Sequence, residues 1–333
     1  MNKKNVIAIW WAFDRRYRRS YLLLIRNTFL IMQTTPITRD DLAKSVISVP
    51  PMARNSDLKF CPAENKKIIR HIENGGVTTL LYGGNANFYH IALSEYEEIL
   101  GGLAELAGPD SLIIPAVGPA YGTMMDQAAI FAQFDYPTVM ALPQQALTTP
   151  DGIEIGLRHL AEKVGKPIVV YIKHDGFIEV ENVKRLVDDG LVSWIKYATV
   201  RDDPSEDAYL SALVDAVDPN MIISGIGEQP AIIHMRDFGV VGFTAGCVCV
   251  RPDLSQKMLV AIQAGNFDRA EEIRKIFLPL EDLRNEINPV RVLHDAVELA
   301  GIGKTGPALP LLTRLDADQQ VLVKAAAVAL LNV

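Results

Sequence analysis

The chain has 333 residues, of which 49% are hydrophobic and 22% are charged, and its formal net charge is −7. This composition excludes a largely disordered protein, and the acidic balance disfavours a general nucleic-acid binder, because neutralising phosphates requires a basic surface. We therefore expect a globular protein that acts on a small molecule. The three cysteines, Cys61, Cys247 and Cys249, lack the spacing of a zinc site, and we expect buried, unreactive thiols.

Residues 1–31 differ from the rest of the chain. Basic residues dominate this segment and interrupt two apolar runs, at 7–13 and 21–25. Neither run reaches the ~18 residues that a membrane-spanning helix needs, and neither is followed by the small-residue cleavage site of a signal peptide. Met32 offers an alternative start of translation. We therefore expect residues 1–31 to be an extension outside the fold, and we expect no membrane partner.

From residue 46 onward, short apolar runs alternate with segments of helical spacing, such as 94–106 and 154–164. Eight such repeats are typical of a (β/α)8 barrel. A doubly wound sheet is the alternative, but the first run is not followed by its glycine-rich phosphate turn. We predict an α/β fold, with a TIM barrel over residues 44–250 and strands at 46–49, 78–82, 111–117, 138–142, 167–172, 191–196, 221–224 and 240–245.

Residues 251–333 contain helical patterns and no further strand pattern. We predict a C-terminal helical region with helices at 252–264, 268–276, 280–287, 290–299 and 316–331. A glycine cluster, Gly301-Ile-Gly-Lys-Thr-Gly306, follows the fourth of these helices. It follows a helix, lacks the spacing of a phosphate-binding loop and precedes prolines, so we expect a turn there.

One lysine stands out at the end of a buried strand pattern. The run Leu191-Val-Ser-Trp-Ile-Lys196 is mostly apolar up to the lysine, and strands of parallel sheets are buried on both faces. Burial disfavours the charged form of an amine, so a free amine becomes available to attack a carbonyl group and form an imine. A lysine that extends from the strand end into solvent is the ordinary alternative. We predict that Lys196 is catalytic and that the only cofactor-like species is a covalent imine on it.

Further polar residues follow the fifth strand pattern, on the rim where active sites of this fold lie. Tyr171 ends the run next to the strand of Lys196, and a phenol there could relay protons during imine formation; a structural tyrosine is the alternative. Lys173 and His174 follow, and they could meet a second polar group of a substrate or be solvated loop charges. We predict that Tyr171 is catalytic and that Lys173 and His174 bind substrate.

Glycine-rich loops after three other strands leave room for a ligand. Backbone N–H groups in the loop after the second strand could bind a carboxylate, although an ordinary turn would use the same residues. We predict substrate contacts from these loops by Gly84, Asn85, Ala86, Gly227, Glu228 and Thr244. The histidines are scattered, and no metal-ligand spacing is present, so we predict no metal site.

The chain resembles the dihydrodipicolinate synthase/N-acetylneuraminate lyase family of Schiff-base-forming barrel lyases over about residues 40–310. Ile195-Lys196-Tyr-Ala-Thr199 is similar to the family's lysine motif Ile-Lys-x-Ala/Ser-Thr, and Tyr171 lies 25 residues before the lysine. Gly265-Asn-Phe-Asp-Arg-Ala270 resembles the family's Gly-Asp/Asn-x-x-x-Ala turn. The resemblance implies a pyruvate-type 2-oxo acid bound as an imine on Lys196, with Tyr171 moving protons. It also implies a cytoplasmic protein that forms a homodimer or homotetramer.

The chain departs from the family pattern in three loops. The family commonly reads Gly-Thr-Thr-Gly-Glu where this chain has Gly84-Asn85-Ala86-Asn87-Phe88, so hydroxyl groups that bind carboxylate are missing. The synthases have Pro-Tyr-Tyr where this chain has Pro143-Gln144-Gln145, and we include Gln145 among the substrate-binding residues. The family's Tyr-Asn-x-Pro, followed by an arginine in the synthases, is replaced by Tyr171-Ile-Lys-His-Asp-Gly176.

These departures are compatible with the imine chemistry but weaken the case for condensing pyruvate with aspartate semialdehyde. We therefore predict a Schiff-base-forming lyase or aldolase that acts through Lys196 on pyruvate or another 2-oxo acid, sugar-derived acids included. A true dihydrodipicolinate synthase of lysine biosynthesis is the alternative. A catalytically silent, metabolite-binding barrel is the second alternative.

Overall fold

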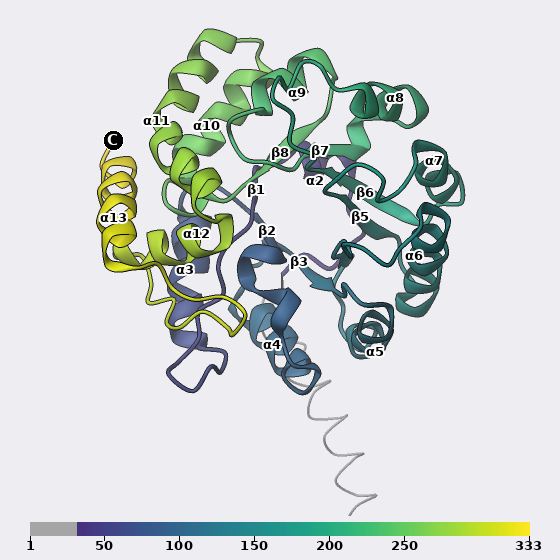
Figure 1. Cartoon of the computed structure of the whole chain (residues 1–333), viewed down its shortest axis with the longest axis horizontal. Coiled ribbons are helices and arrows are strands. Elements are labelled where there is room, and N and C mark those ends of the chain that lie inside the picture. The colour runs from purple at the N-terminus through teal and green to yellow at the C-terminus, as the bar shows by residue number, and fades with distance from the viewer. Residues whose placement is uncertain (1–31) are drawn as a thin grey trace, which may run out of the picture. The chain divides into compact units, whose positions relative to one another are not determined.

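Eight parallel strands close into a barrel in this computed structural model, which describes residues 32–333 (Figure 1). The strands follow one another around the barrel in chain order, and the first pairs with the last. Their bounds are β1 Ile47–Ser48, β2 Thr79–Tyr82, β3 Leu112–Val117, β4 Met140–Ala141, β5 Ile168–Ile172, β6 Val192–Tyr197, β7 Ile222–Ser224 and β8 Gly242–Ala245. Each strand lies within a predicted run or extends it by one residue, so the predicted (β/α)8 fold is confirmed. The predicted extension at residues 1–31 lies outside the described residues.

Helices cover the outside of the barrel, and Figure 1 shows α4 to α8 around its rim. Their bounds are α2 Arg39–Lys44, α3 Pro62–Asn74, α4 Leu93–Leu106, α5 Tyr121–Phe131, α6 Pro150–Val164, α7 Val180–Asp188, α8 Ala208–Ala216 and α9 Ala231–Asp237, with short 3-10 turns η1 Gly84–Ala86, η2 Phe88–His90, η3 Pro219–Met221 and η4 Cys247–Cys249. Because helices lie on one face of the sheet and side chains fill the interior, the strands are apolar on both faces. No helix of residues 32–333 combines the length and the apolar character that crossing a bilayer demands.

Local sequence signals explain where individual helices begin and end. Thr149 precedes α6 and accepts a hydrogen bond from the Gly152 amide at 3.2 Å, and Pro150 occupies the first helical turn, where its missing N–H costs nothing. Gly165 ends the helix with a φ of +67°, a conformation that glycine adopts without strain. The turn from α6 into β5 is therefore encoded locally.

Four helices follow the barrel: α10 Pro252–Gln263, α11 Phe267–Glu286, α12 Pro289–Leu299 and α13 Ala317–Leu331. The two helices predicted at 268–276 and 280–287 are wrong, because α11 runs through both without a break. Pro279 lacks an N–H and removes one backbone hydrogen bond inside the helix. Phe277 and Leu280 are both buried on either side of it, and this packing keeps the helix continuous.

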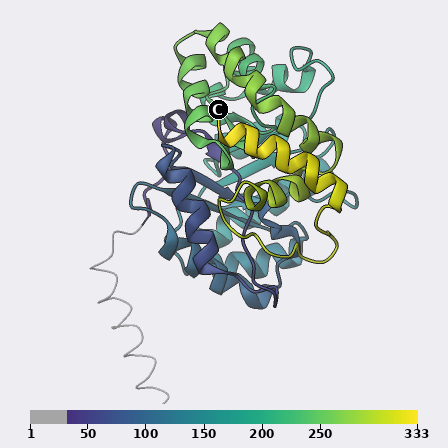
Figure 2. The same ribbon diagram turned by 90° about the vertical axis from the view of Figure 1, so that its left-hand side faces the viewer.

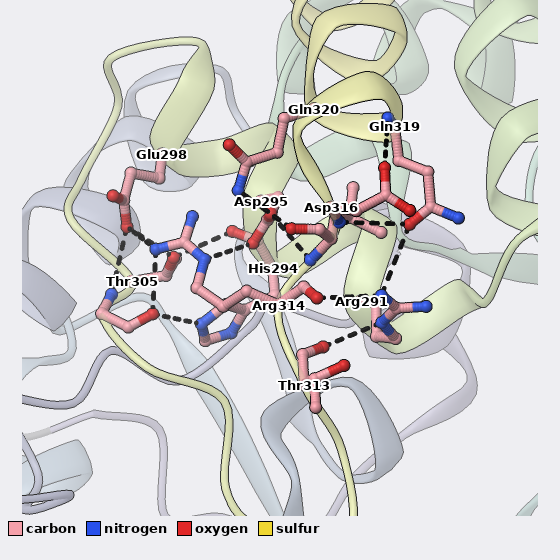
Figure 3. A network of polar contacts seen from close by, with 12 residues as sticks. Arg291, His294, Asp295, Glu298, Thr305, Thr313, Arg314, Asp316, Gln319 and Gln320 are labelled. Carbon is pink, nitrogen blue, oxygen red and sulfur yellow. Dashed lines mark hydrogen bonds and ion pairs between the residues drawn. The ribbon is translucent and has the colours of Figure 1, made fainter.

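A polar network joins the loop before α13 to α12 (Figure 3). Arg314 donates hydrogen bonds to Asp295 at 2.7 Å and to Glu298 at 3.0 Å, and the Thr305 hydroxyl also donates to Glu298 at 3.0 Å. The carbonyl of Thr305 accepts a hydrogen bond from the Arg54 amide at 3.0 Å, which ties the loop to the segment after β1. The predicted turn at residues 301–306 is thus part of the packing that holds α13 against α11 and α12 (Figure 2).

Candidate active site

Lys196 lies near the carboxyl end of β6 and faces a cavity of about 1070 Å³. Successive side chains of a strand point to opposite faces. Tyr197 points outward, because its hydroxyl donates a hydrogen bond to Asp207 at the start of α8. Lys196 therefore points into the barrel, and only 6% of the residue is exposed.

The surroundings of Lys196 lower the pKa of its ammonium group to about 7. Burial is the largest cause, because it removes the water that stabilises the charged form, and the positive charges of Lys173 and Arg284 act in the same direction. With this pKa, Lys196 is a free amine in about half of the protein molecules at neutral pH. The free amine is the form that attacks a carbonyl group.

Tyr171 on β5 lies opposite Lys196 on β6 in the parallel register of the two strands. The ammonium nitrogen of Lys196 lies 4.6 Å from the centre of the Tyr171 ring, within the range of a cation–π contact. Burial raises the pKa of Tyr171 to about 12, so the phenol keeps its proton at neutral pH and can donate it. The structure thus brings together the two residues that were predicted to be catalytic.

Gly84 and Asn85, in the loop after β2, form another part of the cavity wall. The Ala86 amide donates a hydrogen bond to the Gly83 carbonyl oxygen at 3.1 Å, and Ala86 does not line the cavity. The predicted substrate contact of Ala86 therefore does not fit this geometry. Within residues 32–333, the Gly84 and Asn85 amides make no such hydrogen bond, and these two donors remain available to a carboxylate.

Lys173 and His174 follow β5 but differ in their surroundings. Lys173 lines the cavity, and its desolvation there lowers the pKa of its ammonium group. The His174 ring packs edge-on against Phe177, with 5.6 Å between the ring centres, and its Nδ1 contacts the Asp175 carbonyl oxygen at 3.1 Å. His174 is therefore not part of the cavity wall, and its predicted substrate contact does not fit.

Gly227, in the loop after β7, and Thr244, on β8, both line the cavity. The Gly227 amide donates a hydrogen bond to the Thr244 carbonyl at 3.1 Å. Glu228 is fully buried outside the cavity. The Ser255 hydroxyl donates to its carboxylate at 3.0 Å, and the Glu228 amide donates to Glu281 at 3.0 Å. Glu228 thus faces the C-terminal helices, and the prediction that it touches the substrate does not fit.

Gln145 is exposed and lines a second, smaller cavity of about 250 Å³ instead of the cavity of Lys196. Tyr89 and Lys173 line both cavities. Gln145 would therefore meet only a substrate that extends past these two side chains.

Sequence reasoning missed Arg284, which lines the cavity from α11. Its guanidinium group donates hydrogen bonds to the Ile226 carbonyl at 3.0 Å and to Glu281 at 3.2 Å. An acidic residue three positions before an arginine normally indicates an exposed ion pair on a helix surface, so the pattern carried no signal of burial. Its position in the site follows from α11 packing over the barrel end.

Glu228, Cys247 and Glu281 each place one atom that could bind a metal within 4.8 Å of the others, in the described part of the chain. Burial raises the pKa of both glutamates, and within residues 32–333 neither Oε2 atom has a hydrogen-bond partner. A proton shared between the two carboxyl groups accounts for these features. The adjacent guanidinium group of Arg284 repels a cation, so the cluster is better described as a proton-sharing acid pair.

Comparisons with known proteins agree with this geometry. The family model of the dihydrodipicolinate synthetase family matches residues 43–329. A 4-hydroxy-tetrahydrodipicolinate synthase of Pseudomonas putida is 25% identical, over 72% of this chain and 82% of its own length. A protein of Xanthobacter autotrophicus named probable 5-dehydro-4-deoxyglucarate dehydratase is 23% identical, over 85% of this chain and 95% of its own.

Solved structures share the same fold. The dihydrodipicolinate synthase of Bacillus clausii has a TM-score of 0.76 at 22% identity and covers 88% of this chain and 99% of its own. The sialic acid aldolase of Ruminococcus gnavus has a TM-score of 0.77 at 16% identity and covers 87% of this chain and 97% of its own. Because the matched synthases and dehydratases are lyases, the predicted enzyme class is confirmed. A buried lysine on β6, a tyrosine opposite it on β5 and a family match over 287 of the 333 residues place the chain in the dihydrodipicolinate synthetase family.

Proposed function

We propose that the chain is a Schiff-base-forming lyase that acts through Lys196 on pyruvate or another 2-oxo acid, sugar-derived acids included. The observation that carries this proposal is the state of Lys196. It is an amine buried at the carboxyl end of a barrel strand, its pKa is lowered to about 7, and it faces a cavity large enough for a small acid.

The chemistry follows from the groups around the lysine. The free amine of Lys196 attacks the C2 carbonyl carbon of the acid, and one proton passes from the attacking nitrogen to the carbonyl oxygen to give a neutral carbinolamine. The hydroxyl group then leaves as water with a second proton, for which the Tyr171 phenol is the nearest predicted donor. The resulting iminium withdraws electrons from C3, which allows a bond at C3 to break. In this proposal the Gly84 and Asn85 amides, which line the cavity, hold the carboxylate during these steps.

Relatives of the chain carry two kinds of name, synthase and sugar-acid dehydratase. We favour an aldol-cleavage or dehydratase reaction over dihydrodipicolinate synthesis, because this chain has Gln144 and Gln145 where the synthases carry tyrosines. The exposed position of Gln145, outside the cavity of Lys196, supports this preference. Turnover of pyruvate with aspartate semialdehyde at the rate of an ordinary synthase would reverse it.

Reductive trapping tests the proposal. Wild-type protein treated with pyruvate and borohydride should gain the mass of one reduced adduct, located on the peptide that contains Lys196, and Lys196→Ala should abolish both the adduct and turnover. Lys166→Ala is the matched control, because burial also lowers the pKa of this lysine but it does not line the cavity. Trapping that persists in Lys196→Ala, or no trapping with any 2-oxo acid, would leave the silent metabolite-binding barrel as the better description.

A further inference from the structure

The loop after β7 packs directly against Lys196. The Gly225 amide donates a hydrogen bond at 2.6 Å to the carbonyl of Tyr197, the residue that follows the lysine on β6. A Cβ on Gly225 would lie only 3.0 Å from Lys196 Cγ, a contact tighter than side chains normally make. The loop backbone therefore forms part of the wall around the lysine stem, and a displacement of residues 225–228 would change the surroundings of the amine.

Glu281 and Arg284 of α11 fasten this loop from behind. Arg284 donates a hydrogen bond to the Ile226 carbonyl at 3.0 Å, and Glu281 Oε1 accepts one from the Glu228 amide at 3.0 Å. The same oxygen also accepts a hydrogen bond from Arg284 at 3.2 Å, so one carboxylate holds both the loop and the arginine. Gly227 permits this close approach, since a Cβ there would lie 2.1 Å from Glu281 Oε1. Glu281 is fully buried and does not line the cavity.

The acid pair of Glu228 and Glu281 supplies one negative charge next to Arg284. Both carboxyl groups are fully buried, and repulsion between two buried carboxylates favours one shared proton. The pair then carries a single negative charge, which balances the arginine. Two further neighbours do not alter this charge, because burial raises the pKa of the Cys247 thiol and keeps it neutral, and Ser255 contributes an uncharged hydroxyl.

The charge of Arg284 acts on Lys196, because it lowers the pKa of the lysine together with the charge of Lys173. The titratable and charged groups that face Lys196 or the acid pair from neighbouring elements are Lys173 and Tyr171 of β5, Arg274 and Arg284 of α11 and Cys247 of η4. Because the acid pair opposes Arg284, loss of the negative charge of the pair would leave a larger positive potential at Lys196 and favour its free amine.

We propose that Glu281, together with Glu228, is a positioning residue for the imine-forming lysine. It fastens the loop of residues 225–228 against Lys196 and balances the charge of Arg284, while its own side chain stays outside the cavity. This inference rests on the proposed function, because it gives the acid pair a task in presenting the amine of Lys196. The pair acts through the loop and the arginine and touches no substrate.

The protonation of Lys196 can be measured without imine formation. Competitive labelling with acetic anhydride over a series of pH values, followed by mass spectrometry of the peptide that contains Lys196, gives the midpoint at which the amine becomes free. Glu228→Gln and Glu281→Gln should each leave this midpoint within about 0.3 unit of wild type, because the remaining carboxyl group loses the shared proton and keeps the single charge. The double glutamine variant removes that charge and should lower the midpoint by about 0.5 to 1 unit.

The hydrogen bonds of Glu281 are tested by the rate of reductive trapping with pyruvate. Glu281→Ala removes the acceptor for the Glu228 amide and should slow trapping about tenfold, whereas Glu281→Gln keeps an acceptor oxygen and should retain most of the rate. Asp282→Ala is the matched control, because this neighbouring carboxylate of α11 accepts a hydrogen bond from the Gln229 side chain at 2.8 Å and does not line the cavity. It should leave the rate unchanged.

Thermal melting of each variant identifies any that fails to fold, and the glutamine variants, which keep the size of the side chain, decide the matter if Glu281→Ala does not fold. An unchanged midpoint in the double variant would overturn the inference, as would a shift in each single variant at least half as large as in the double variant. Equal trapping rates of Glu281→Ala and Asp282→Ala would also overturn it. Labelling midpoints that shift as expected in a protein that forms no adduct with any 2-oxo acid would overturn the imine proposal alone.

Discussion

The ammonium nitrogen of Lys196 lies over the face of the Tyr171 ring, 4.6 Å from its centre. The ring makes an electrostatic contact, and the proposed role of the hydroxyl is to donate a proton, so the two contributions can be separated. Tyr171→Phe keeps the ring and should slow reductive trapping by about a hundredfold while the fold remains intact. Tyr89→Phe removes another hydroxyl from the same cavity wall and should change the rate much less. Equal effects of the two variants would contradict a role of Tyr171 in moving protons.

The trapping rate should follow the free amine of Lys196 as pH changes. Lys196 has a pKa of about 7. The rate of reductive trapping with pyruvate should therefore rise between roughly pH 5.5 and 8.5, with a midpoint at about pH 7. Lys173→Met removes one of the charges that lower this pKa and should move the midpoint upward. The measurement uses cyanoborohydride, which tolerates mild acid. A midpoint near 10 in the wild-type protein would show that the lysine is not perturbed.

Burial of Lys196 should also reduce stability in a pH-dependent way. The folded pKa of about 7 is lower than the ordinary value of 10.5, so the unfolded chain binds more protons between these values and stability rises with pH across this window. Lys196→Met should therefore be more stable than wild type at pH 7. The difference in free energy of unfolding should shrink by roughly 2 to 3 kcal/mol between pH 7 and about pH 9. Urea denaturation at the two pH values measures it, and a constant difference would argue against the shift.

Gly227 should tolerate no side chain. Its φ is +112°, and a Cβ would lie 2.1 Å from Glu281 Oε1. Gly227→Ala should lower the free energy of unfolding by about 1 to 3 kcal/mol and weaken ligand binding, because the acid pair and Arg284 must move. Gly176→Ala is the control, since Gly176 also has a positive φ, +73°, but open space around it. A similar loss in both variants would mean that backbone conformation alone matters.

The network of Figure 3 predicts that Arg314 stabilises the C-terminal helices. Arg314→Ala leaves the carboxylate of Asp295, which is fully buried, without its charged partner. We expect a loss of about 1.5 to 3 kcal/mol in urea denaturation. Arg269→Ala removes an exposed ion pair with Glu272 and should change stability by less than about 1 kcal/mol. No difference between the two variants would show that the network adds nothing to stability.

The barrel was predictable because short stretches of sequence encode each of its strands and helices. A strand that is buried on both faces must be apolar over its length, and each of the eight runs is followed by a segment of helical period. Lys196 and Tyr171 were predictable for the same reason, because a polar residue at the end of such a run interrupts a clear pattern. Their opposition across β5 and β6 then follows from the order of strands in a barrel.

The remaining site residues depend on contacts that no local pattern encodes. His174 and Glu228 follow strands as expected of site residues, yet one packs against Phe177 and the other against the C-terminal helices. Arg284 lies 88 residues after Lys196 and enters the site only because α11 is one continuous helix over the barrel end. The sequence pattern predicted two helices, one on each side of Pro279, and the packing that joins them into one helix is visible only in three dimensions.

The continuity of α11 also bears on how new variants of this enzyme could arise. The lysine and tyrosine belong to barrel strands, whereas the arginine and its supporting glutamate belong to a helix encoded by a separate stretch of sequence. Recombination that exchanges residues 267–286 would replace the part of the cavity wall that α11 forms, while the strands that carry Lys196 and Tyr171 stay unchanged. Protein engineers could therefore vary one side of the cavity by exchanging a single continuous segment.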